Sequence, residues 1–181
     1  MDSFIQEATA ANPDAKWKVL CTHTNIYFSD GDSGIALYAN QDYDMLADNG
    51  IDIVMTGHRH FYARSFQMYR NNPMSSVEDS VVVNPEGTVY YVIGTMSVQG
   101  RSSDTIANKP YTAFCESGIT ITSELDYFTN FFSTVSVSTT DTETSFTINT
   151  YKNTLTEVSG APKKITQTEL IDSYQIIKTL D

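Results

Sequence analysis

Basic side chains are scarce in this sequence of 181 residues. It holds 11 lysines and arginines against 22 aspartates and glutamates, which gives a formal net charge of -11. Proteins that bind nucleic acid or anionic membranes need basic residues to displace condensed counterions. We therefore expect neither a nucleic-acid surface nor a membrane as a partner. The acidic excess is compatible with divalent cations, although excess carboxylate more often only solvates a protein surface.

Long apolar runs are also missing. No stretch approaches the about 18 consecutive apolar residues that a membrane-spanning helix needs. Residues 1–17 lack the basic segment and the following apolar segment of a secretory signal peptide. The chain as written is therefore predicted to carry neither a signal peptide nor a membrane span.

Cysteines are few, and charged residues make up only 18% of the chain. Cys21 and Cys115 could pair, but Cys21 lies in an apolar run, where a buried thiol behaves as a small hydrophobic side chain. We expect two free thiols. A chain of this length forms a core without a disulfide or a metal. Tyrosine, threonine and serine are plentiful instead, which favours strands.

Helical and strand patterns alternate in the first third of the chain. Apolar residues recur at helical spacing near the start, and two short apolar runs follow with a stretch of good helix formers between them. The predicted elements are a helix at 2–11, a strand at 17–22, a loop at 30–34, a helix at 35–49 and a strand at 51–55. Near-continuous apolar strands around a helix predict a βαβ unit with parallel strands. Active sites in such sheets gather at the carboxyl ends of the strands.

Short runs that alternate apolar and polar residues fill the rest of the chain. They predict strands at 81–83, 88–93, 132–138, 145–151 and 170–177, with connections at 139–144 and 157–164. Such alternation is typical of antiparallel sheets with one buried face. The fold class is therefore α/β, with an N-terminal βαβ unit followed by mostly antiparallel β-strands.

Histidine is also rare in this sequence. The three histidines are His23, His58 and His60, and all three follow the predicted parallel strands. Neutral imidazole is a common ligand of Zn, Fe and Mn, and a His-x-His pair can direct both rings at one ion or at two adjacent ions. We expect the three rings to converge on one metal site. Gly57 precedes His58, where a sharp turn favours a residue without Cβ.

The histidines lie in two motifs that resemble a known family. Residues 57–64 match the G-H-x-H-x-Y-x-R signature of calcineurin-like metallophosphoesterases related to purple acid phosphatases. Residues 17–27 are similar to the upstream W-to-Y block of that family, which contains H-x-P-x-Y. Residues 84–91 and 171–178 resemble its following strand and its closing strand. The resemblance covers nearly the whole chain and is to the C-terminal half of the family's domain.

The resemblance implies a fold and a reaction. The fold is the C-terminal half of an αββα sandwich, in which residues 1–125 belong to the metallophosphoesterase domain. Residues 126–181 form its closing antiparallel β segment or a small β appendage. The reaction is hydrolysis of a phosphate ester by a hydroxide held between two metal ions, which are Fe, Zn or Mn. The resemblance also points to a secreted or cell-surface parent protein.

Residue roles follow from the same resemblance. His23 and His58 would bind one metal, and His60 would bind the other. The remaining residues of the two motifs would support the site: Gly57, Tyr62 and Arg64 by fixing the turn, and Asn25 and Tyr27 by lying near the mouth for the substrate.

Several family motifs are absent. The sequence has no Gly-Asn pair, and its one Gly-Asp pair lies in the predicted loop after His23. Two cations about 3.5–4 Å apart need an anionic ligand between them. We therefore predict that this chain alone binds at most one metal well and shows little turnover. Asn25 replaces the usual proline, and the acid catalyst is unassigned. Asp30 and Asp32 could move a proton or bind a cation, or could form a solvated turn.

Two hypotheses remain from the sequence. The chain is a fragment of a phosphatase or phosphodiesterase, completed by an N-terminal half that supplies the missing ligands. The alternative is a non-catalytic metal-binding or β-rich interaction module derived from that family. In either case a parallel sheet without its first strands exposes an edge, so we expect a dimer or a complementing chain.

Overall fold

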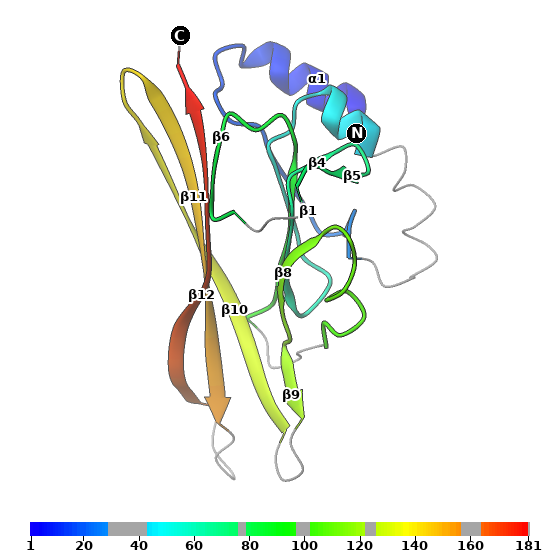
Figure 1. Cartoon of the computed structure of the whole chain (residues 1–181), viewed down its shortest axis with the longest axis vertical. Helices are drawn as coiled ribbons and strands as arrows, with labels where there is room; N and C mark the ends of the chain where they lie inside the picture. Colours follow the sequence, from blue (N-terminus) through cyan, green and yellow to red (C-terminus); the bar gives the residue numbers. More distant parts are fainter. Residues whose placement is uncertain (29–42, 76–78, 97–101, 122–125, 157–163, 181) are drawn as a thin grey trace.

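The computed structural model describes residues 1–28, 43–75, 79–96, 102–121, 126–156 and 164–180. In the described part, helix α1 (Asp2–Ala11) and a helical segment at 43–48 lie on one side of a five-stranded sheet. A second five-stranded sheet packs against its other side. Figure 1 shows this layering, with the long strands of the second sheet on the left and α1 at the upper right.

The first sheet has the strand order β1-β2-β7-β3-β8. Its strands are β1 (Val19–Thr22), β2 (Ile53–Thr56), β7 (Val89–Ile93), β3 (Tyr62–Ser65) and β8 (Thr112–Glu116). The first three are parallel to one another, and β3 is antiparallel to both of its neighbours. This arrangement confirms the predicted parallel pairing of the strands that precede the histidines.

The second sheet has the order β6-β12-β11-β10-β9. Its strands are β6 (Val81–Val83), β12 (Lys164–Thr179), β11 (Glu143–Thr156), β10 (Asp126–Thr139) and β9 (Ile119–Ile121). All neighbours are antiparallel except β6 and β12, which are parallel. A small hairpin of β4 (Met68–Tyr69) and β5 (Asn72–Pro73) completes the described strands.

The structure corrects several predicted elements. The strand predicted at 88–93 lies in the first sheet, parallel to β2, rather than among the antiparallel strands. The strand at 81–83 pairs in parallel with β12. Both pairings are non-local, and alternation within one strand does not reveal its partner. The helix at 35–49 is described only at 43–48, and the loop at 30–34 lies outside the described residues.

The cysteine prediction holds in one respect and fails in another. Both thiols are free, as expected. Cys21, however, is exposed rather than buried. The reason is that β1 is an edge strand, so the apolar run around Cys21 lacks a neighbouring strand on one side among the described residues.

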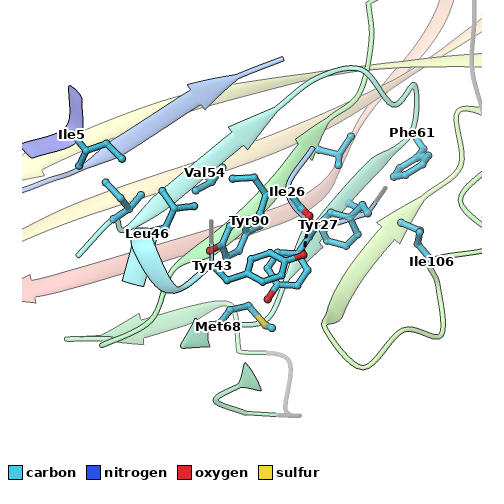
Figure 2. Close-up of a cluster of buried hydrophobic side chains, with 14 residues drawn as sticks. Ile5, Ile26, Tyr27, Tyr43, Leu46, Val54, Phe61, Met68, Tyr90 and Ile106 are labelled. Atoms are coloured by element: carbon cyan, nitrogen blue, oxygen red, sulfur yellow. Dashed lines mark hydrogen bonds between the residues drawn. The ribbon is translucent and has the colours of Figure 1, made fainter. Parts of the chain in front are cut away.

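Two buried clusters hold the layers together. The cluster on the helix side joins Ile5 and Leu46 to β2 and β7, and Figure 2 shows its tyrosines packed around Tyr27. The cluster between the sheets includes Ile53 from β2 and Phe146 from β11. Because β2 and β7 contribute to both clusters, the parallel strands that precede the site are fixed from both faces.

A buried ion pair also connects the two sheets. Arg64 on β3 donates to Asp172 on β12 through Nε at 2.7 Å and through Nη2 at 3.1 Å. The Tyr62 hydroxyl donates to the same carboxylate at 2.6 Å, and the guanidinium lies 4.6 Å from the ring centroid of Tyr174. Such a bidentate pair fixes β3 relative to β12.

We expect the fold to lose stability in alkali. Burial raises the pKa of four tyrosine phenols above their ordinary value of 10.0: Tyr27, Tyr62, Tyr91 and Tyr174. Nearby Asp172 adds to the increase at the last three. The folded chain therefore keeps protons that the unfolded chain releases, so this stability is complete below pH 10 and is lost as the pH rises above it. Each tyrosine should contribute about 1.4 kcal/mol per pH unit to the decline. Urea unfolding measured on both sides of pH 10 gives this slope.

Tyr91 offers a matched control for that measurement. Its hydroxyl is buried and has no hydrogen-bond partner in the described part of the chain. Tyr91→Phe should therefore cost little at neutral pH and reduce the alkaline slope by about one quarter, since it removes one of the four phenols. An unchanged slope in this variant would show that burial of this phenol does not cause the decline.

No helix among the described residues is long and apolar enough to cross a membrane.

Candidate metal centre

His23 and His58 meet at the carboxyl end of the parallel strands. β1 and β2 pair in register from Val19 with Ile53 to Thr22 with Thr56, so the residues that follow them start from neighbouring points. His58 Nδ1 lies 3.3 Å from His23 Nε2. The rings meet edge to face, with centroids 5.2 Å apart and an interplanar angle of 86°. Both side chains are exposed, so further ligands can reach them.

The backbone at the second motif is strained at His58 itself. This residue has φ of 62°, in the left-handed region that residues with a Cβ seldom adopt. A Cβ on Gly57 would lie 3.4 Å from His23 Nδ1, which is an ordinary van der Waals contact, so the His23 ring does not require glycine at this position. From the sequence we expected Gly57 to form the sharp turn, whereas the residue with the left-handed backbone is His58. Strain of this kind is typical of ligand sites.

The pair has the spacing of two ligands on one metal ion. Imidazole nitrogens bind zinc at about 2.0–2.1 Å, and two such ligands at a tetrahedral angle are about 3.3 Å apart. The observed nitrogen separation of 3.3 Å has the same value. It is also compatible with a hydrogen bond between the rings, with one nitrogen protonated. The two residues therefore fit one metal, with coordination positions left for other ligands.

The third histidine does not complete a metal-binding group. His60 is half-buried. Among the described residues no group of three or more His, Cys, Asp or Glu side chains is placed to hold a metal ion. The structure therefore brings together two of the three expected ligands, and a two-metal centre does not fit the described residues alone.

Asn25 and Tyr27 lie deeper than the histidines. Asn25 is fully buried, and neither of its side-chain polar atoms has a hydrogen-bond partner in the part of the chain that the structure describes. The Tyr27 hydroxyl donates to Asn71 Oδ1 at 2.8 Å and lies 3.2 Å from the Arg70 carbonyl oxygen. Burial, followed by the neighbouring tyrosines, raises the pKa of Tyr27, so its phenol stays protonated at neutral pH. Figure 2 shows this ring within the tyrosine cluster.

Tyr62 and Arg64 are directed toward the second sheet. Both contact Asp172, so they anchor the strand that follows the histidine turn. Sequence reasoning did not single out Asp172. A signal was present, because Asp172 has the same parity along the predicted strand as Tyr174 and Ile176, which are buried. A charged residue at an inward position predicts a buried partner.

Asp30 and Asp32 lie outside the described residues, so their proposed roles stay predictions.

Comparison with known proteins supports the fold class. No protein-family model matches this sequence, and no curated protein matches it. A similar solved structure is a purple acid phosphatase isolated from yellow lupin (Lupinus luteus) seeds, with a TM-score of 0.55 and 14% sequence identity. The match covers 97% of this chain and 28% of that chain. The α/β fold class is confirmed, and at this identity the similarity shows the fold alone.

Proposed function

We propose that this chain is part of a metal-dependent phosphoester hydrolase and supplies a portion of its metal centre. The observation that carries the proposal is the 3.3 Å separation of His58 Nδ1 and His23 Nε2 at the carboxyl ends of two parallel strands. The likeness to a purple acid phosphatase fold adds support, although the chain spans 28% of that structure.

The proposed roles follow from the chemistry of each side chain. His23 and His58 hold one ion, and His60 is the ligand on this chain for a second ion. Bound transition metals such as Fe, Zn or Mn activate water and stabilise charge on phosphate oxygens. The left-handed turn at His58 sets the direction in which its ring leaves the strand. Repulsion between two cations needs an anion between them, so bridging carboxylate ligands have to come from beyond the described residues.

The incomplete ligand set also favours a second candidate, a non-catalytic module that binds one metal. No group of three acidic, cysteine or histidine ligands occurs among the described residues. The two candidates differ in turnover. A catalytic fragment gains activity when a chain that supplies carboxylate ligands is added, and a non-catalytic module does not.

Titration with Zn²⁺ or Mn²⁺ tests the metal site. We expect one ion per chain by calorimetry, with weak affinity. His58→Asn should weaken binding by more than about tenfold, because loss of partners outside the ligand shell alone costs 10–100-fold. Asparagine tolerates the left-handed backbone at this position, so the variant removes the ligand and keeps the turn.

Cys21→Ser is the control for that titration, because Cys21 is an exposed soft ligand on β1, two residues before His23. It should leave the affinity unchanged. Equal affinity of His58→Asn and the wild type would overturn the assignment of His58. Two ions per chain together with robust hydrolysis of a chromogenic phosphate ester would show that this chain is complete without further ligands.

A further inference from the structure

β1 leaves one edge of the first sheet without a partner among the described strands. The Lys18 carbonyl accepts the amides of Asp52 and Ile53, so the backbone at Lys18 points toward β2. Backbone groups alternate in direction along an extended strand. The amide and carbonyl groups of Val19 and Cys21 therefore point away from β2, toward the free edge. Such an edge is a template for pairing with another strand.

The side of this edge that faces the second sheet is apolar. Val19 is in register with Ile53, and Cys21 with Met55, so both share the face that packs between the sheets. Val19 is nevertheless exposed, as is Cys21. The interior between the two sheets is thus open beside β1.

The second sheet extends past this opening. Val135 and Val137 on β10 lie opposite Ile148 and Phe146 of β11, which belong to the buried cluster between the sheets. Residues directly opposite in an antiparallel pair share a face. Val135 and Val137 are nevertheless 47% and 54% exposed, so the described residues cover this inward-facing part of β10 only in part.

Trp17 contacts the second sheet next to the exposed valines. It lies two residues before β1, and its ring centroid is 5.4 Å from that of Phe146, which is opposite Val137 in the pair of β10 and β11. A strand added beside β1 would continue the first sheet over the exposed valines.

The opposite side of the edge is mostly apolar, although Thr9, Asn12 and Lys18 also line it. A cavity of about 270 Å³ lies between α1 and β1. Its lining includes Ile5 and Ala8 of α1 and Leu20 of β1, and Phe4 is 68% exposed beside it. A strand next to β1 would therefore meet apolar surface on both of its faces.

We propose that the β1 edge binds an extended strand from outside this sequence, parallel to β1 and apolar on both faces. Parallel pairing continues the direction of β1, β2 and β7. Strands that are buried on both faces are apolar throughout, and the two surfaces described above require this pattern. The similar solved structure contains chain beyond the matched 28%, so this fold has material from which an additional strand can come.

A second copy of this chain fits the edge less well. Two copies related by a twofold axis would pair their β1 strands antiparallel, which reverses the direction of the sheet. Each copy also carries a formal net charge of -11, so close approach is opposed by repulsion. The occupant is therefore a different segment.

Cys21 makes the proposal testable by reversible disulfide capture. The probe is a synthetic strand of alternating valine and isoleucine with one central cysteine and lysines at both ends. The probe cysteine is supplied as its mixed disulfide with 2-mercaptoethanol, and the probe is equilibrated with the full chain in free 2-mercaptoethanol. The Cys21 thiol then displaces 2-mercaptoethanol from the probe by thiol–disulfide exchange, and the resulting disulfide between chain and probe is measured by mass spectrometry. We expect capture at Cys21 and slower amide hydrogen exchange at Val19 and Cys21. A probe with proline beside its cysteine cannot pair and should be captured at least about tenfold less.

Two paired variants locate the contact. Val135→Thr with Val137→Thr should reduce capture about tenfold, because the probe loses apolar surface to cover. The control is Val81→Thr with Val83→Thr on β6, at the other edge of the same sheet, where the exposed fractions are 49% and 59%. Capture should be unchanged there.

Three results would overturn the proposal. One is an equal loss of capture in both pairs of variants. Another is equal capture of the proline probe. The last is protection of the Val19 and Cys21 amides without probe in a chain that sediments as a dimer, which would assign the edge to a second copy.

Discussion

Asp172→Ala is expected to lower the free energy of unfolding by about 3–5 kcal/mol, because removal of one partner leaves a buried charge uncompensated. Arg64 and Asp172 have side-chain exposures of 2% and 6%. Burial alone would lower the pKa of Arg64, but the hydrogen bond to Asp172 together with the electrostatic effect of Tyr91, Asp172 and Tyr62 outweighs burial and raises the pKa, so the guanidinium stays charged. For a domain of this size the loss corresponds to a decrease in melting temperature of roughly 10 °C. Urea unfolding and thermal melts measure both quantities.

An exposed ion pair provides the control. Arg70 donates to Asp48 at 2.8 Å, but the two side chains are 43% and 56% exposed. Asp48→Ala should cost less than about 1 kcal/mol, since solvent screens surface pairs. The combined Arg64→Met and Asp172→Leu variant should recover most of the loss, because apolar residues can replace a buried pair. A single Asp172→Ala variant as stable as Asp48→Ala would show that the buried pair contributes no more than a surface pair.

The position of the histidine pair could be predicted from the sequence because it depends on local features. Each apolar run that precedes His23 and His58 is short and bounded, and parallel strands place their carboxyl ends at one rim. The register of β1 and β2 then places the two rings together. The left-handed backbone at His58 could not be predicted in this way, because no apolar pattern indicates it.

Features that depend on contacts between the two sheets could not be predicted from the sequence. The alternation around Val135 and Val137 predicts one inward face, and the pairing with Ile148 and Phe146 agrees with it. Their exposure depends on where the first sheet ends, which no local pattern contains. β3 was not predicted as a strand, because its residues belong to a motif that was interpreted by its chemistry. The partner of Arg64, Asp172, could not be predicted either, since it lies 108 positions further along the chain.

The free edge of β1 and the incomplete ligand set of the histidine pair lie close together. β1 leads directly to His23, so a strand parallel to β1 on its free edge would end beside the histidine pair. Residues that follow such a strand would be placed to reach the same ion. The proposed strand partner and the missing anionic ligands could therefore belong to one segment, and this would make metal affinity depend on strand docking.

Gly94→Ala is expected to cost about 2–5 kcal/mol. Gly94 has φ of +74°, and a Cβ there would lie 2.6 Å from Phe131 Cδ2 and 2.9 Å from Phe131 Cβ. Phe131 cannot easily retreat, since it is buried between the sheets and its amide donates to the Thr95 carbonyl at 2.9 Å. The left-handed backbone costs about 1–2 kcal/mol for a residue with a Cβ, and overpacking adds about 1–3 kcal/mol.

Gly50→Ala separates these two contributions. Gly50 has φ of +62°, but a Cβ there would approach only Lys18 Nζ, at 3.9 Å. Its substitution should cost the backbone contribution of about 1–2 kcal/mol and nothing for packing. Urea unfolding of both variants gives the difference, which measures how tightly the end of β7 is packed against β10. Equal costs at the two positions would mean that Phe131 moves aside freely and that this contact does not fix the two sheets relative to each other.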